Sequence, residues 1–284
     1  MKPQPKFAAE TADHEKFKRL LRKPAPTQRY VMHFTPRSGS SWLTDLCKLT
    51  GRLSEPGEYF NPQFVPKIST AINARTLPEF VQGITRRRNA GGVFGCQITI
   101  YQLHVTFSTE EMFDQLLGGA RMFWLIREDI VLQAVSLLKM QQTKIAHRPT
   151  ADEATIQASE SQFSYDAPAL RRWLEHLHRA EKASEALFAR FGYQPLRLSY
   201  EQLTALPILD VVNIIATHVG VEPIAEMPGE SSHSKIGTDR NQAFADQFRK
   251  ENANLVAKIE ANRAKGLSLI NRTPPLIRGT DLRV

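Results

Sequence analysis

The chain has 284 residues, of which 42% are hydrophobic, and a formal net charge of +8. This length and apolar content are typical of one large α/β domain or two small ones, and no apolar stretch approaches the roughly 20 residues of a membrane span. The N-terminus is polar and charged, and Cys47 and Cys96 lie in apolar segments, so we expect a cytoplasmic protein without a signal peptide, whose thiols are buried rather than bound in disulfides or to zinc.

The first 28 residues predict a basic arm, and residues 29–284 predict a single α/β domain. The segment from Lys16 to Lys23, KFKRLLRK, is rich in cations and can form a short amphipathic helix that lies on the inner membrane face. Because basic arms often have no such role, we favour the alternative of a solvated arm. A basic protein also suits nucleic acid, but the sequence contains no nucleic-acid module, and we expect no nucleic-acid partner.

The next segment combines an apolar strand, a loop of small residues and a helix. Residues 30–34 are rich in β-formers, residues 35–41 read TPRSGSS, and apolar residues recur at helical spacing from Trp42 to Leu49. Helix N-termini in this geometry bind anions through backbone N–H groups and the helix dipole, and the planar guanidinium of Arg37 suits phosphate or sulfate oxygens. Gly39 is not followed by Gly-Lys-Ser/Thr, as a triphosphate loop requires, so we expect one phosphate here rather than three.

Three motifs in order, PRSGSS at 36–41, TG at 50–51 and PGEYFNP at 56–62, resemble bacterial carbohydrate sulfotransferases of the trehalose 2-sulfotransferase type. The resemblance implies a sulfotransferase fold, the donor 3′-phosphoadenosine 5′-phosphosulfate (PAPS), a sugar or glycolipid acceptor and a homodimer. It also implies that Glu58 is the general base. The residues implied to cradle the 5′-phosphosulfate are Arg37, Ser38, Gly39, Ser40, Ser41 and Trp42.

Further along the chain, strands alternate with helices. We predict strands at residues 93–101, 121–126 and 195–199, and helices from Ser108 or Thr109 to 117, at 130–141, 166–192 and 207–219, with a terminal helix around 244–255. Such alternation predicts βαβ units and a parallel sheet. The expected fold is therefore a P-loop-like, three-layer α/β fold, with a short parallel sheet of four or five strands flanked by helices.

The junction that follows the strand at 121–126 carries a second candidate phosphate site. Arg127 stands at the carboxyl end of that strand, where open α/β sheets bind ligands, and Ser136 lies on the helix that follows. This stretch, including QAVS at 133–136, resembles the sulfotransferase site for the 3′-phosphate of the donor. The alternative is that Arg127 pairs with Glu128 or Asp129 and that Ser136 only packs.

Three later features are less specific. Tyr200 opens the run YEQL, which resembles a sulfotransferase run whose tyrosine lies against the adenine, although an ordinary tyrosine at a strand end fits equally. Lys235 and Arg240 lie in a segment that is only loosely similar to a phosphate-contacting loop. Residues 142–164 are polar and aperiodic, as in lids and binding loops, and we assign them no role.

Together these features predict sulfuryl transfer from PAPS to a hydroxyl, without a requirement for metal. Glu58 would accept the hydroxyl proton. Arg37 would stabilise charge on the leaving 5′-phosphate as an electrostatic clamp, because arginine does not readily give up its proton. One rival function is a kinase-like nucleotide enzyme, which the missing Gly-Lys-Ser/Thr disfavours. Another is an inactive nucleotide- or membrane-binding relative, which the presence of Arg37, Glu58 and Arg127 disfavours.

Overall fold

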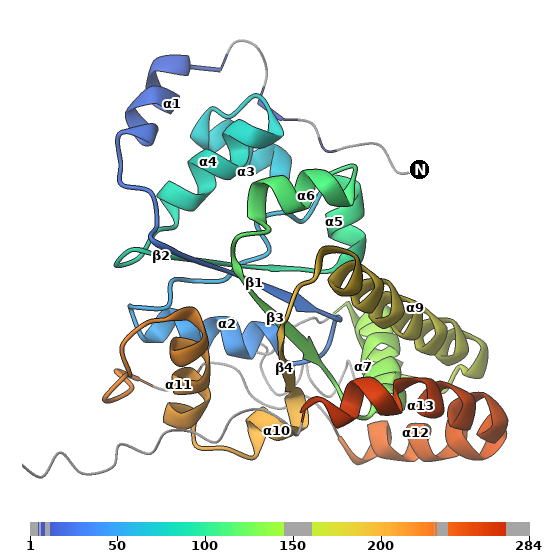
Figure 1. The fold of residues 1–284 in the computed structure, drawn as a ribbon. Coiled ribbons are helices and arrows are strands. Elements are labelled where there is room, and N and C mark those ends of the chain that lie inside the picture. Colours follow the sequence, from blue (N-terminus) through green and yellow to red (C-terminus); the bar gives the residue numbers. More distant parts are fainter. Residues whose placement is uncertain are drawn as a thin grey trace, which may run out of the picture.

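Four strands form one parallel sheet in the order β2-β1-β3-β4 (Figure 1). A computed structural model describes residues 12–144, 161–229, 231 and 238–270, together with residues 5, 7 and 8. The strands are β1 (Gln28–Phe34), β2 (Val93–Ile98), β3 (Arg121–Ile126) and β4 (Leu196–Ser199). The predicted α/β class and the predicted parallel sheet are therefore confirmed, with four strands rather than five.

The central strands are buried on both faces, which explains why their sequences are nearly continuous apolar runs. Val31 lies opposite Cys96 of β2 and Met122 of β3, and all three are buried in one apolar cluster. The next residues in β1 and β3, Met32 and Phe123, are also paired and belong to a second cluster on the other face. Successive side chains along each strand therefore point to opposite faces of the sheet and pack into two separate cores.

Helices cover both faces of the sheet, and a further group of helices packs beside it (Figure 1). One face carries α1 (His14–Leu21), α3 (Val65–Ile72), α4 (Leu77–Arg87), α5 (Ile100–Thr106) and α6 (Glu110–Leu117). The other face carries α2 (Ser40–Leu49), α10 (Tyr200–Thr204) and α11 (Ile208–Val219). A third apolar cluster lies among α7 (Ile130–Thr143), α9 (Ala167–Phe191), α12 (Asp239–Glu251) and α13 (Ala253–Ser268).

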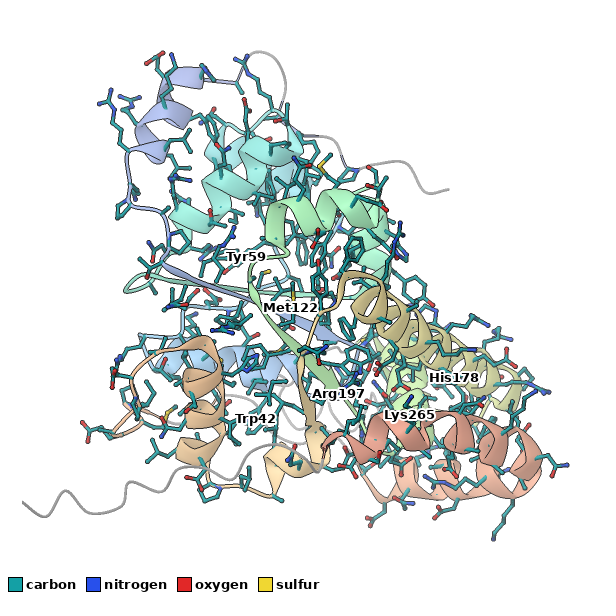
Figure 2. All side chains as sticks on the ribbon, in the orientation of Figure 1. Trp42, Tyr59, Met122, His178, Arg197 and Lys265 are labelled. Atoms are coloured by element: carbon teal, nitrogen blue, oxygen red, sulfur yellow. The ribbon has the colours of Figure 1, made fainter. Side chains whose placement is uncertain are left out.

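Side chains fill the space between the sheet and both helical layers, as Figure 2 shows. Tyr59 and Met122 are buried in the cluster under α3–α6, whereas Trp42 packs against the cluster on the opposite face. The sheet is therefore the middle layer of three, as expected.

Within the segment predicted as a basic arm, α1 packs on the domain. The Phe17 side chain is buried, and its ring lies over Gly83 of α4, where an added Cβ would come within 3.2 Å of it. Because the apolar side of α1 faces the protein, its exposed side carries the cations of Lys16, Lys18 and Arg19. Among the helices that the structure describes, none has the length and apolar character needed to cross a membrane.

Two predicted element boundaries are wrong. The strand expected at 93–101 ends at Ile98, because Thr99 caps a new helix and its hydroxyl accepts a hydrogen bond from the N–H of Gln102. The predicted terminal helix is two helices, α12 and α13, separated at Asn252. In contrast, the predicted caps Thr109 and Asp166 are confirmed, since each side chain accepts a hydrogen bond from the first turn of its helix.

Candidate active site

A cavity of about 1710 Å³ opens at the carboxyl edge of the sheet, where the loops after β1 and β3 meet α5, α10 and α12. Such crevices are the usual ligand sites of open parallel sheets. The cavity brings together all predicted site residues except Ser38, which is buried beside it. The predicted residues that line it are Arg37, Gly39, Ser40, Ser41, Trp42, Glu58, Arg127, Ser136 and Tyr200.

The loop between β1 and α2 has the backbone expected of an anion cradle. Arg37 and Gly39 both have left-handed φ angles, 67° and 83°. Gly39 is the N-cap of α2 and supplies no capping side chain, and the first turn of α2 carries no acidic residue. The positive end of this helix dipole therefore faces the cavity without a resident carboxylate.

Tyr200 packs directly against this loop. A Cβ atom built on Gly39 would lie 2.6 Å from Cδ2 of Tyr200, so only glycine fits here. The guanidinium carbon of Arg127 lies 5.1 Å from the centre of the Tyr200 ring, within the range of a cation–π contact. Tyr200 thus joins the two arginine-bearing junctions, and the predicted adenine contact remains a prediction.

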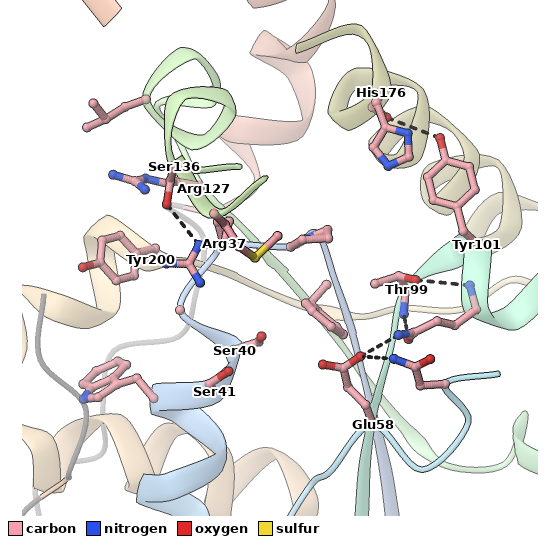
Figure 3. A pocket seen from close by; sticks show the side chains of 18 of the residues that line it. Arg37, Ser40, Ser41, Glu58, Thr99, Tyr101, Arg127, Ser136, His176 and Tyr200 are labelled. Carbon is pink, nitrogen blue, oxygen red and sulfur yellow. Dashed lines mark hydrogen bonds between the residues drawn. The ribbon is translucent and has the colours of Figure 1, made fainter. Parts of the chain in front are cut away.

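The two predicted phosphate sites adjoin each other. Nε of Arg37 donates a hydrogen bond of 3.0 Å to Oγ of Ser136 on α7 (Figure 3). Burial lowers the pKa of Arg37, and the positive charge of Arg127 lowers it further. Two cations held this close in a partly buried cleft favour a bound anion, because an anion offsets both the burial and the repulsion.

The alternative ion pairs considered for Arg127 are wrong. Nε of Arg127 lies 3.4 Å from Oε1 of Glu201, at the start of α10. Asp129 instead caps α7, accepting a 2.8 Å bond from the N–H of Leu132, and its carboxylate binds Arg249 at 2.6 and 2.7 Å. Arg127 is therefore oriented from α10, across the cavity edge.

A buried arginine from α13 supports the backbone at this junction. Arg263 donates hydrogen bonds to the carbonyl oxygens of Arg127 (2.6 Å) and Glu128 (2.7 Å). Its charge is balanced by Glu181 of α9, 2.6 Å away, and both side chains are buried. This support was not predicted from the sequence, since no local pattern links residues 127 and 263.

Glu58 reaches the same cavity from a segment that runs beside β2. The carbonyl of Gly57 accepts a 3.1 Å hydrogen bond from the N–H of Gln97, which fixes the chain just before the carboxylate. Oε2 of Glu58 accepts hydrogen bonds from the side-chain amides of Asn61 (3.1 Å) and Gln102 (2.5 Å) (Figure 3). Glu58 is half-buried and lines the cavity.

Several lining residues were missed by the sequence analysis. The ring of Tyr101 is stacked on His176 of α9, with ring centres 4.5 Å apart and planes 19° apart, and both line the cavity near Gln102. The sequence Thr99-x-x-Gln102 is a capping-box pattern, and it could have indicated the start of α5 where a strand was predicted.

The loosely assigned C-terminal residues have different outcomes. The guanidinium of Arg240 lies over the rings of Phe163 and Phe244, at 5.9 and 5.5 Å from their centres, and Arg240 is not among the described residues that line the cavity. Lys235 and residues 145–160 of the polar loop lie outside the described residues.

The fold and the cavity define an α/β protein in which a loop resembling a phosphate loop and a carboxylate line one cavity. A sequence model of the Stf0 sulphotransferase family matches residues 29–251, well over half of the chain, and the chain belongs to this family. Its members are sulfotransferases, and this membership supports a sulfuryl-transfer enzyme. A sulfotransferase from Alicyclobacillus acidocaldarius of known crystal structure is 16% identical to the chain, over 96% of this chain and 97% of that one, with a TM-score of 0.40. No curated protein matches the chain.

Proposed function

We propose that the protein transfers the sulfuryl group of PAPS to a hydroxyl of a sugar or glycolipid. The observation that carries the proposal is the contact between Arg37 and Ser136, because it joins the loop after β1 to the junction after β3 at one cavity. A nucleotide with phosphates at both its 5′ and 3′ positions offers one anionic group to each.

The residues present fit this donor. Arg37, Gly39 and the α2 N-terminus suit the 5′-phosphosulfate, whereas Arg127 and Ser136 suit the 3′-phosphate. Tyr200 presents its ring between the two junctions, where it can stack on the adenine. The cavity of about 1710 Å³ exceeds the roughly 300–1,000 Å³ of a site for one drug-sized ligand, and it therefore has room for donor and acceptor together.

The proposed reaction needs a general base for the acceptor hydroxyl and a positive group that stabilises the leaving phosphate. PAPS supplies a sulfuryl group whose bond to the 5′-phosphate oxygen breaks as the acceptor oxygen bonds to sulfur, and the electron pair stays with the phosphate. Glu58 takes the proton of the acceptor hydroxyl as a general base. Arg37 and the α2 N-terminus stabilise the charge that grows on the phosphate, and Arg37 keeps its own proton.

The acceptor class is inferred from the wall beside Glu58. Tyr101 is 38% exposed and presents a ring that is backed by His176. His104, Gln102 and Gln63 line the same cavity and have polar side chains. A flat aromatic surface among hydrogen-bonding groups suits a sugar ring, which has apolar C–H faces and a polar rim.

The expected homodimer and the peripheral membrane contact also remain proposals. The exposed cations of α1 support an electrostatic contact with anionic lipids, which would suit a glycolipid acceptor.

The test is a transfer assay with sulfur-labelled PAPS and a panel of sugars and glycolipids. In Glu58→Gln the turnover should fall by roughly two to four orders of magnitude, because the size is kept and the base is lost, while nucleotide affinity changes little. Glu226→Gln, which changes an exposed glutamate that does not line the cavity, is the matched control. Near-normal turnover in Glu58→Gln would remove Glu58 from the mechanism.

A further inference from the structure

The carboxylate of Glu58 is held at one oxygen only. Oε2 accepts hydrogen bonds from Nδ2 of Asn61 and Nε2 of Gln102. Among the described residues Glu58 forms no ion pair, although Arg37 and Arg127 line the same cavity. In Figure 3 the second oxygen of Glu58 is turned toward the side of the cavity where Ser40 and Ser41 lie.

Both amide groups are oriented by the backbone. Oε1 of Gln102 accepts a 2.9 Å hydrogen bond from the N–H of Thr99, and Oδ1 of Asn61 accepts a 3.1 Å bond from the N–H of Gln63. With each amide oxygen fixed on a backbone donor, each NH₂ group must face Glu58. An amide nitrogen only donates hydrogen bonds. Both NH₂ groups can therefore bind the carboxylate, and neither can accept the proton of the acceptor hydroxyl.

We propose that Gln102, assisted by Asn61, is a positioning residue for Glu58, and that Oε1 of Glu58 is the oxygen that accepts the acceptor proton. The inference rests on the proposed function. It adds which carboxylate oxygen accepts the proton and which side chains orient that carboxylate. In the step, the proton moves from the acceptor hydroxyl to Oε1, the acceptor oxygen bonds to sulfur, and the bond from sulfur to the 5′-phosphate breaks.

Neutral donors are well suited to this task. A lysine or arginine at this position would instead form an ion pair with Glu58. The two amides fix the carboxylate without neutralising it.

The start of α5 builds this support. The hydroxyl of Thr99 accepts a 3.2 Å bond from the N–H of Gln102, while the side chain of Gln102 reaches back to the N–H of Thr99. This reciprocal capping box is normally a helix-stabilising device. Here the nitrogen of the capping glutamine remains available, and it binds Glu58.

The test is a double-mutant cycle between Gln102→Leu and Glu58→Gln, with transfer of labelled sulfur from PAPS as the readout. Leu is similar in size to Gln and removes the donor. We expect Gln102→Leu alone to lower kcat by roughly 10- to 100-fold, because small misplacements of a reacting group have effects of this size, while KM for PAPS changes little. In the Glu58→Gln background, Gln102→Leu should have almost no further effect on kcat, because residues that act as a unit are not additive.

Thr109→Ala is the control for loss of a helix cap, since Thr109 caps α6 and does not line the cavity. It should lower the melting temperature and leave kcat unchanged. Equal losses from Gln102→Leu in both backgrounds would overturn the inference, because they would show a purely structural role. Normal turnover in Glu58→Gln would also overturn the inference, because Glu58 would then not be the base, whereas failure of the unsubstituted protein to transfer labelled sulfur from PAPS would overturn the proposed function. If Gln102→Leu does not fold, as judged by the absence of a cooperative thermal unfolding transition, the same cycle with Asn61→Ala decides between these outcomes.

Discussion

The two strand-to-helix junctions at the cavity have similar connections but differ in how the N-terminus of the helix is capped. In both, an arginine follows a buried strand: Arg37 after β1 and Arg127 after β3. The helix after β1 begins at Gly39 without a side-chain cap, whereas the helix after β3 is capped by Asp129. The first junction can therefore bind an anion through its main chain, and the second can do so only through side chains, because a carboxylate already occupies its helix N-terminus.

This difference predicts two kinds of sensitivity to mutation. Main-chain binding depends on loop shape, and so on the left-handed Gly39 and its contact with Tyr200. Side-chain binding depends on the charge of Arg127, which Arg263 and Glu201 hold in place.

The largest expected effect comes from Gly39→Ala. The added Cβ would lie 2.6 Å from Tyr200, in a backbone with φ of 83°. Strain of this kind costs about 1–3 kcal/mol, and relief of the clash must displace either the loop or the tyrosine. We expect affinity for 3′,5′-diphosphoadenosine, measured by calorimetry, to fall by about two orders of magnitude.

Gly51→Ala is the matched control for this prediction. Gly51 is also left-handed, with φ of 63°, but nothing lies within 4 Å of its added Cβ. This variant should lose some stability through its backbone conformation and retain its nucleotide affinity. Similar affinity losses in the two variants would mean that the contact between Gly39 and Tyr200 does not shape the site.

The second effect concerns the junction that binds through side chains. Arg127→Ala should weaken 3′,5′-diphosphoadenosine by about 1.5–3 kcal/mol, the value of a hydrogen bond to a charged group, and should weaken 5′-AMP much less. Arg87→Ala removes an exposed charge that does not line the cavity and controls for net charge. Equal losses for both nucleotides would show that Arg127 does not recognise the 3′ position.

The smallest effect is expected from Asp129. Asp129→Ala removes the α7 cap and the partner of Arg249, so the free energy of unfolding should fall by about 1 kcal/mol. Asp129→Asn keeps a capping oxygen and should lose less. In both variants nucleotide affinity should change little. A marked gain in affinity for Asp129→Ala would show that the α7 N-terminus also binds the anion, and would remove the contrast between the junctions.

The sequence was sufficient where local patterns decide the structure. The strand predicted at 121–126 has the observed bounds of β3, because a strand buried on both faces is a bounded apolar run. The strand at 93–101 was predicted too long, because residues 98–101, ITIY, all have high β-propensity and continue from β2 into α5. There the capping pattern of Thr99 decided the structure against β-propensity.

The site was predictable in its motifs but not in its long-range contacts. Arg37, Glu58 and Arg127 were identified from short motifs, and they share a cavity because parallel strands end at one edge of the sheet. In contrast, Arg37 meets Ser136 across 99 residues of sequence, and Arg263 supports Arg127 across 136. Such contacts depend on how α7 and α13 pack, and no spacing along the chain specifies them.

The central claim, that two adjoining single-phosphate sites serve one nucleotide, is tested most directly by thermal unfolding with two ligands. A ligand that binds only the native state stabilises it by about 2.7 kcal/mol at a hundredfold excess over its Kd. We predict that 3′,5′-diphosphoadenosine without magnesium raises the melting temperature clearly, and that ATP with magnesium at the same concentration does far less. A larger shift with ATP and magnesium would contradict the account and favour a kinase-like use of this cavity.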